Sequence, residues 1–361
     1  MEYAVKKTVE LLAIDSPSGY TEEAEQYVIR EFDLLGFKTT HTVKGGVIID
    51  FGGPDTAEGG VLFEAHTDTL GGMVAEIKPN GRLRIENIGG LNANNTETEN
   101  CRVATKFSGV YEGTLQLINA SIHVNGDYKE IKRTFETTEV VLDEDVKSAE
   151  DVRKLGISVG DFVCFEPRTR ITSSGYIKSR FLDDKLSVGI LLGLAKYIHD
   201  EKPSLKRHTW GYVTVYEEVG HGGASAIPAG VTDAISIDMG CVGEGLQCTE
   251  RQVSICAKDS GGPYSYQTTK ALIAAAEAAG ADYAVDVYPH YGSDVEVTLK
   301  AGNDVRHGLI GAGVYASHGY ERSHKDGVMN TLKLLGSTSE RKSGRARDSV
   351  TEIKNKCHIF N

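Results

Sequence analysis

The chain has 361 residues, 40% of them hydrophobic, and a formal net charge of -12 at pH 7. Such a length predicts about two globular domains. The acidic excess argues against nucleic acid or an anionic membrane as a partner, because both attract basic protein surfaces. No stretch approaches about 18 uncharged apolar residues, and the first residues have the pattern of a short amphipathic helix rather than a signal peptide. We therefore expect a cytoplasmic protein.

The six cysteines are widely scattered and include no C-x-x-C pair. Their spacing indicates neither a zinc ribbon nor a disulfide framework, so buried reduced thiols are the expected state. Other side chains must carry the chemistry.

Helices and apolar strands alternate along most of the chain. Thr21 is a candidate N-cap for a helix that Gly36 ends. Further strands are predicted at 47–51, 61–65, 212–216 and 234–238, and further helices at 186–198 and 268–280. This alternation predicts an α/β sheet layered between helices on both faces.

The pattern of apolar residues along the sequence changes between residues 72 and 164. Short β-like segments separated by turn signals replace the alternation there, which predicts a small β domain inserted into the larger fold. The larger domain would then consist of residues 1–71 and 165–336. Residues 337–361 are polar and locally basic without a strong period, and are expected to form a tail.

The stretch VLFEAHTDTLGG places His66 and Asp68 where the strand at 61–65 ends. Residues i and i+2 of an extended chain point to the same side, so the two side chains can share one small volume. A carboxylate near a metal-bound imidazole fixes its tautomer. By itself an H-x-D pattern is weak, because most histidines near strand ends are structural or exposed.

Acidic pairs occur at other element ends. Asp183 and Asp184 precede the buried helix at 186–198, where one carboxylate could simply cap the helix. Glu217 and Glu218 follow the strand at 212–216, and the glycines after them permit the bend that both would need to face one site. An exposed acidic turn is the alternative there. Asp238 ends the strand at 234–238, and a buried carboxylate needs a partner.

The segment SHGYERSH adds His318 and His324, each of which could be a surface residue. Taken together, imidazoles and carboxylates recur at the carboxyl ends of predicted strands, where open α/β sheets build their sites. Such carboxylates would repel one another unless cations compensated them. Imidazoles and carboxylates without cysteine suit zinc, cobalt or manganese.

The ordered blocks AHTD, LDDK, EEVGHGG, DMG and SHGYE resemble the M42 glutamyl-aminopeptidase-like metallopeptidases, which include the tetrahedral (TET) aminopeptidases. The resemblance spans about residues 1–336. It implies an α/β class fold, with a three-layer α/β/α zinc-peptidase-like catalytic domain and an inserted small, PDZ-like β-barrel. It also implies peptide substrates and a homo-oligomer, often of twelve subunits, with neither nucleic acid nor membrane as a partner.

The resemblance further implies a co-catalytic pair of divalent ions, zinc first, with cobalt or manganese as alternatives. His66, Asp183 and Asp238 would hold one ion, and Asp183, Glu218 and His318 the other, so that Asp183 bridges them. Glu217 would act as the general base on a metal-bridging water, and Asp68 would orient His66. His318 is preferred to His324 because Glu321 follows it at the spacing seen in the family.

Three departures from the family pattern concern the surroundings of this site. Lys185 stands where an arginine is usual, which keeps the charge but loses planar two-point bonding. The run GAGVYASHGYER replaces the usual approach to the second histidine. Asp294, in YGSD, could lie near the site, but we assign it no role.

Two other functions are consistent with parts of the sequence. A metal-independent glycoside hydrolase of the endoglucanase kind would need two carboxyl groups but neither histidine, and the single tryptophan, Trp210, gives little support for a sugar-stacking cleft. A non-catalytic homologue would be expected to have lost the base or a ligand, and none is missing.

Overall fold

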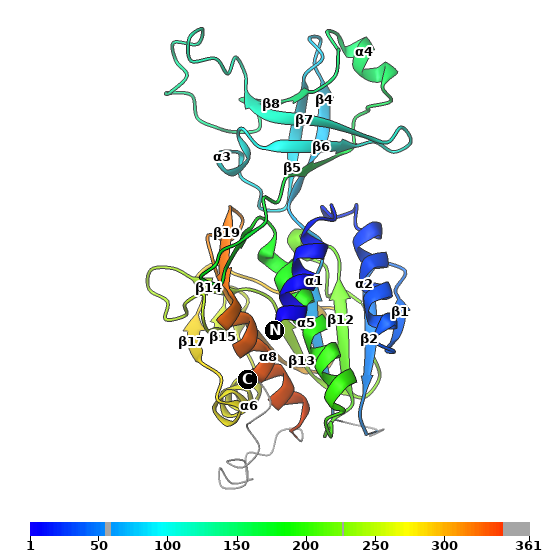
Figure 1. Cartoon of the computed structure of the whole chain (residues 1–361), viewed down its shortest axis with the longest axis vertical. Helices are drawn as coiled ribbons and strands as arrows, with labels where there is room; N and C mark the ends of the chain where they lie inside the picture. Colours follow the sequence, from blue (N-terminus) through cyan, green and yellow to red (C-terminus); the bar gives the residue numbers. More distant parts are fainter. Residues whose placement is uncertain (55–58, 226, 342–361) are drawn as a thin grey trace.

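The computed structural model describes residues 1–54, 59–225 and 227–341. The chain forms a large mixed sheet flanked by helices, and a separate barrel that stands at the top of the view in Figure 1. The central strands of the sheet run in the order β2-β12-β3-β13-β18. Their bounds are Val47–Gly52 (β2), Thr209–Thr214 (β12), Gly60–His66 (β3), Val231–Ile237 (β13) and Arg306–Tyr315 (β18).

Four of these strands are parallel neighbours. β3 pairs in parallel with β12 on one side and with β13 on the other, and β13 pairs in parallel with β18. The carboxyl ends of β12, β3 and β13 therefore meet at one edge of the sheet, which is where α/β proteins place ligands. Thr214, the last residue of β12, lies opposite His66, the last residue of β3.

Shorter strands extend the sheet on both sides. They are β1 (Lys38–His41), β10 (Arg170–Ile171), β11 (Tyr176–Ser179), β14 (Gly240–Val242), β15 (Val253–Asp259), β16 (Gly262–Pro263), β17 (Tyr283–Val287) and β19 (Glu321–His324).

Helices pack on both faces of this sheet, as the three-layer prediction requires. The helices of the large domain are α1 (Glu2–Leu12), α2 (Glu22–Leu34), α5 (Leu182–Glu201), α6 (Tyr266–Ala279), α7 (Asp294–Lys300) and α8 (Lys325–Ser339). Alternate residues of β3 divide between two apolar clusters. Phe63 belongs to the larger cluster, with residues of α1, α2 and α5, whereas Leu62 belongs to a smaller one that includes Val295 of α7.

The inserted segment forms a closed six-stranded barrel in the order β4-β5-β8-β7-β6-β9. Its strands are β4 (Gly71–Ile77), β5 (Leu83–Ile88), β6 (Asn100–Ala104), β7 (Val110–Leu117), β8 (Thr138–Leu142) and β9 (Phe162–Phe165), and it also contains the short helices α3 (Ala93–Thr96) and α4 (Ala149–Lys154). The first and last strands thus lie next to the predicted bounds of 72 and 164. A closed barrel leaves no open sheet edge.

Several local expectations differ from the structure. α5 spans Leu182–Glu201, but Asp183 and Asp184 have non-helical dihedral angles, so its regular part begins close to the predicted residue 186. α8 runs to Ser339, so the predicted boundary at 336 falls inside a helix. The rest of the predicted tail, from residue 342, lies outside the described residues. Thr21 is the N-cap of α2, yet its hydroxyl donates to Glu25 instead of accepting a backbone N–H.

Among the described residues, no helix combines the length and apolar content needed to span a bilayer. Five of the six cysteines lie within the described chain, and all five are free thiols.

Candidate metal centre

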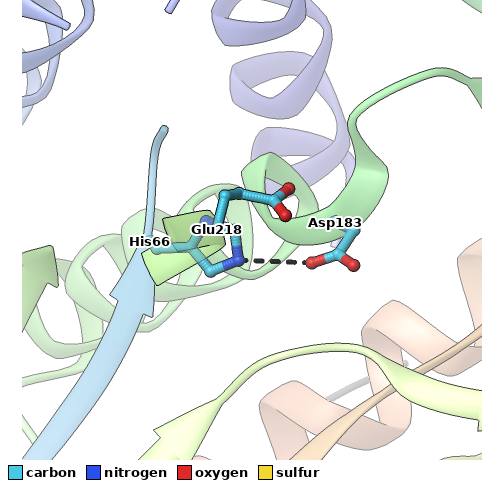
Figure 2. Close-up of side chains that lie close together, drawn as sticks. All are labelled: His66, Asp183 and Glu218. Carbon is cyan, nitrogen blue, oxygen red and sulfur yellow. Dashed lines mark hydrogen bonds and ion pairs between the residues drawn. The ribbon is translucent and has the colours of Figure 1, made fainter. Parts of the chain in front are cut away.

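The side chains of His66, Asp183 and Glu218 meet at the carboxyl edge of the sheet (Figure 2). His66 ends β3, Asp183 lies in the first turn of α5, and Glu218 follows β12 in the short helix η1 (Glu217–Val219). One ligand atom from each lies within 4.8 Å of the others. Three segments that are far apart in the chain therefore form a group of the size that holds an ion.

Asp183 faces both candidate histidines with different oxygens. Its Oδ1 lies 3.2 Å from His66 Nε2, and its Oδ2 lies 3.5 Å from His318 Nε2. His318 Nε2 also lies 3.6 Å from Glu218 Oε2. Asp183 thus stands between the two imidazoles, with one oxygen toward each.

A second group at the same edge consists of His66, Asp184 and Asp238. Asp238 directly follows β13, so it projects from the strand next to β3. Asp184 contributes here although the predicted ligand set included only its neighbour Asp183. Its Oδ2 accepts from the backbone N–H of His66 at 3.2 Å. The structure does not use it as a cap, because the N-cap position of α5 is Phe181, and both Asp183 and Asp184 have non-helical dihedral angles.

Asp68 connects His66 to the turn that carries the glutamates. Its carboxylate accepts from the hydroxyl of Ser18 and from the backbone N–H groups of Glu217 and Glu218, at 3.1 and 3.3 Å. The closest contact to His66 Nδ1 is the main-chain carbonyl of Asp68 at 3.0 Å, with its carboxylate at 3.5 Å. Asp68 is therefore placed both to fix the ring of His66 and to hold the start of the turn.

Glu321 holds the backbone on the other side of the cluster. Its carboxylate accepts from the N–H groups of His318, at 3.0 Å, and Asp183, at 3.1 Å. No local pattern in the sequence predicted these contacts of Ser18 with Asp68 and of Glu321 with the backbone.

His318 and His324 have different surroundings. His318 lies beside Asp183 and Glu218, whereas the ring of His324 accepts from the N–H of Asp326 and caps α8. The segment after β5 also contacts His318: Asn95 Nδ2 donates to its carbonyl at 3.1 Å, and a Cβ on Gly90 would lie 2.5 Å from its Nδ1. The barrel side of the molecule thus abuts this histidine.

Burial and mutual repulsion make the carboxylates of the cluster hard to ionise. Burial, with neighbouring carboxylates, raises the pKa of Glu217, Glu218 and Asp184 well above the ordinary value and that of Asp238 to about 7. Asp183 is the exception: burial opposes its ionisation, but hydrogen bonds from His318 and His66 lower its pKa. Cations placed among these groups would relieve the repulsion.

Two oxygens of the cluster are buried without a hydrogen-bond partner within the described residues, Asp184 Oδ1 and Glu218 Oε1. Buried carboxylate oxygens without a partner are costly, and ligation to a cation would satisfy them. The donor set contains imidazole and carboxylate only, which suits divalent ions such as zinc, cobalt or manganese. The residues present therefore fit metal ions.

A small, partly open hollow lies beside the cluster. Its lining combines apolar residues with candidate ligands, namely Leu70, Leu91, Arg180, Phe181, Asp183, Glu218, His318, Gly319 and Glu321. Three of the predicted ligands, Asp183, Glu218 and His318, therefore border this hollow.

The sequence model of the family described as M42 glutamyl aminopeptidase matches residues 45–334. The chain belongs to the M42 family. Membership makes it an aminopeptidase, a hydrolase of peptide bonds. This supports the peptidase over the glycoside hydrolase as the function of the site.

Individual relatives agree with this placement. A Bacillus subtilis protein named as an aminopeptidase, YhfE, is 45% identical over 336 residues, which cover 92% of this M42 chain and 97% of the relative. Two archaeal structures share the fold. An aminopeptidase from Desulfurococcus kamchatkensis has a TM-score of 0.84 at 20% identity and covers 96% of this chain and 99% of its own. The TET1 peptidase of Pyrococcus horikoshii, whose title describes assembly into a tetrahedron or a large octahedral shell, has a TM-score of 0.81 at 22% identity, over 93% and 99%.

Proposed function

We propose that this M42 aminopeptidase uses a co-catalytic pair of divalent ions to release N-terminal residues from peptides. The observation that supports this most is the position of Asp183, whose two oxygens face His66 and His318 separately. A carboxylate so placed can bridge two cations. In the proposed assignment, His66, Asp183 and Asp238 would hold one ion, and Asp183, Glu218 and His318 would hold the other, with zinc as the first candidate and cobalt or manganese as alternatives.

When bound, such a pair of ions supplies Lewis acidity that lowers the pKa of water and polarises the scissile carbonyl. Glu217 is the proposed general base. Its Oε2 lies 3.7 Å from His66 Nε2, so it is beside the cluster but outside both ligand groups. Its carboxylate takes a proton as the water oxygen bonds to the carbonyl carbon, and returns that proton to the leaving nitrogen as the C–N bond breaks.

The other residues position these groups. Asp68 orients His66 and holds the N–H groups of Glu217 and Glu218, and Glu321 holds the backbone of Asp183 and His318. The hollow beside Asp183, with Leu70 in its wall, is where we propose that the substrate approaches the cluster.

A Glu217→Gln variant tests the assignment of the base. We expect its metal content to stay near two ions per chain while kcat on aminoacyl anilides falls by about 10²–10⁴, because an amide cannot accept the proton. The matched control is Glu144→Gln, at an exposed site outside the cluster, which should behave like the wild type. Full turnover by Glu217→Gln would reject the role of this residue.

Metal exchange tests the ions themselves. We expect a chelator to remove the activity, and zinc, cobalt or manganese, each added separately to the chelated enzyme, to restore it to different extents. Cleavage of a soluble cellulose by chelated protein would instead favour the glycoside hydrolase.

We also propose that the chain forms a homo-oligomer, up to a dodecamer. This extends to the present chain what the titles of related structures describe, including a dodecamer of PhTET1. Light scattering of the purified protein tests it, and a monomer mass at micromolar concentration would reject it.

A further inference from the structure

The turn of residues 217–224 carries two of the proposed functional groups, and its internal hydrogen bonds include those from the N–H groups of Gly220 and Ala224 to the carbonyl groups of Glu217 and His221. It begins with the short helix η1 and continues through Gly220, Gly222 and Gly223. Glycines lower the cost of a bend but leave the backbone free to adopt other conformations. Contacts from elsewhere in the fold must therefore hold Glu217 in place.

Asp294, at the start of α7, supplies one such contact. Its Oδ1 accepts from the backbone N–H of Gly223 at 2.6 Å, and its Oδ2 accepts from the hydroxyl of Thr214, at the end of β12. The fit is close, because a Cβ on Gly222 would lie 2.4 Å from Asp294 Oδ1, and one on Gly223 would lie 2.2 Å from its carbonyl oxygen. Asp294 is only 3% exposed, so water does not compete for these bonds.

Lys44, in the connection between β1 and β2, supplies a further contact, in addition to the bonds of Asp68 to the N–H groups of Glu217 and Glu218. Its ammonium group donates to the carbonyl oxygens of His221 and Gly222, the latter at 2.6 Å, and lies 3.4 Å from that of Ala224. An ammonium group has three N–H donors and no acceptor, so it matches a concave row of carbonyls. Asp294 thus binds an N–H group of the turn while Lys44 binds its carbonyl groups.

We propose that Asp294 and Lys44 are positioning residues, which hold the turn 217–224 so that Glu217 and Glu218 face the cluster. This inference rests on the proposed function for the role of Glu217. Neither side chain belongs to the proposed ligand sets, so both act through the backbone of the turn. A displacement of about 1 Å in a reacting group can lower a rate about 10²-fold.

Three variants test the proposal, with Lys38→Met in the exposed strand β1 as the control. Lys44→Met removes the ammonium group from a half-buried position and should leave the fold intact. Asp294→Ala removes the carboxylate. Asp294→Asn keeps an oxygen for the Gly223 N–H, and its amide can donate to the hydroxyl of Thr214. Its kcat and its rate of hydrogen exchange should therefore lie closer to those of the wild type than to those of Asp294→Ala.

Two measurements separate positioning from general structure. In the metal-free protein, we expect hydrogen exchange in a peptide covering 217–224 to quicken about threefold or more in Lys44→Met and Asp294→Ala, and to stay unchanged in the control. In the enzyme loaded with zinc, kcat should fall about tenfold in these two variants. KM should stay within about twofold of the wild type, and metal content near two ions.

The outcomes distinguish this inference from the proposed function. Faster exchange with unchanged kcat, or unchanged exchange in Lys44→Met, would overturn the positioning role. A wild type without peptidase activity would instead refute the proposed function, and the exchange measurement would then decide alone whether the two residues hold the turn.

Discussion

Replacing Glu64 by glutamine should change how the stability of the large domain depends on pH. Glu64 lies in β3 with no exposed surface, and the hydroxyl of Thr298 lies 2.9 and 3.2 Å from its two carboxylate oxygens. Burial, together with the negative charge of Asp294, raises the pKa of Glu64 from 4.5 to about 8. The folded protein therefore binds this proton far more tightly than the unfolded chain does.

The direction and the size of the change in stability follow from the pKa of Glu64 in the unfolded chain, 4.5, and in the folded protein, about 8. The stability that the bound proton contributes is fully present below pH 4.5 and is lost as the pH rises through about 8. At about 1.4 kcal/mol per pKa unit, the whole loss is about 5 kcal/mol, of which about 3.5 kcal/mol falls between pH 5 and pH 8. Glutamine does not titrate. The free energy of unfolding should thus fall by about 3.5 kcal/mol more in the wild type than in Glu64→Gln.

Urea unfolding of the chelated protein at pH 5 and pH 8 measures this difference. The single tryptophan, Trp210, provides the signal, because it lies in β12 opposite Leu62 of β3 and so reports on the sheet that contains Glu64. Glu144→Gln, at an exposed position, serves as the control for the loss of a carboxylate. If the wild type and Glu64→Gln show the same pH dependence, the buried carboxyl of Glu64 does not hold its proton as argued.

Further predictions concern the core, the helix cap and the metal. Phe63→Ala, in the buried strand β3, should lower the free energy of unfolding by about 3–5 kcal/mol, whereas Phe107→Ala, at a side chain 97% exposed, should change it by less than about 0.5 kcal/mol in the same urea assay. His324→Ala should cost about 1 kcal/mol for the lost cap of α8 but keep two ions by elemental analysis, and loss of an ion would contradict the assignment of His318. Zinc at about 100 times its Kd should stabilise the chelated protein by about 2.7 kcal/mol for each ion bound, seen as a higher unfolding midpoint; an unchanged midpoint would argue against a metal site.

The sequence predicted the elements that apolar periodicity specifies. The strands that end at His66 and before Asp238 were predicted because continuous apolar runs mark buried parallel strands. The β-strand pattern of the inserted segment was also predicted, because short apolar segments and turn residues replace the helical spacing of apolar residues there. The closure of that segment into a barrel depends on pairings between distant strands, which no local pattern encodes.

Contacts between distant residues limited what could be predicted about the site. Lys44 lies 178 residues before Gly222, and Asp294 lies 71 residues after Gly223, so their roles became visible only when the fold brought them together. The pair Asp183 and Asp184 suggested either a cap or a ligand. Local sequence could not decide between these, because the answer depends on dihedral angles that the surrounding fold imposes.

The order of the ligands along the chain has a consequence for synthesis on the ribosome. Chains fold from the N-terminus as they emerge, and His318 follows β18, which is the last in chain order of the five central strands. A nascent chain that has not reached β18 already contains every acidic residue of the cluster, yet it lacks the second imidazole. The proposed metal centre would therefore be complete only after β18 and His318 have been synthesised.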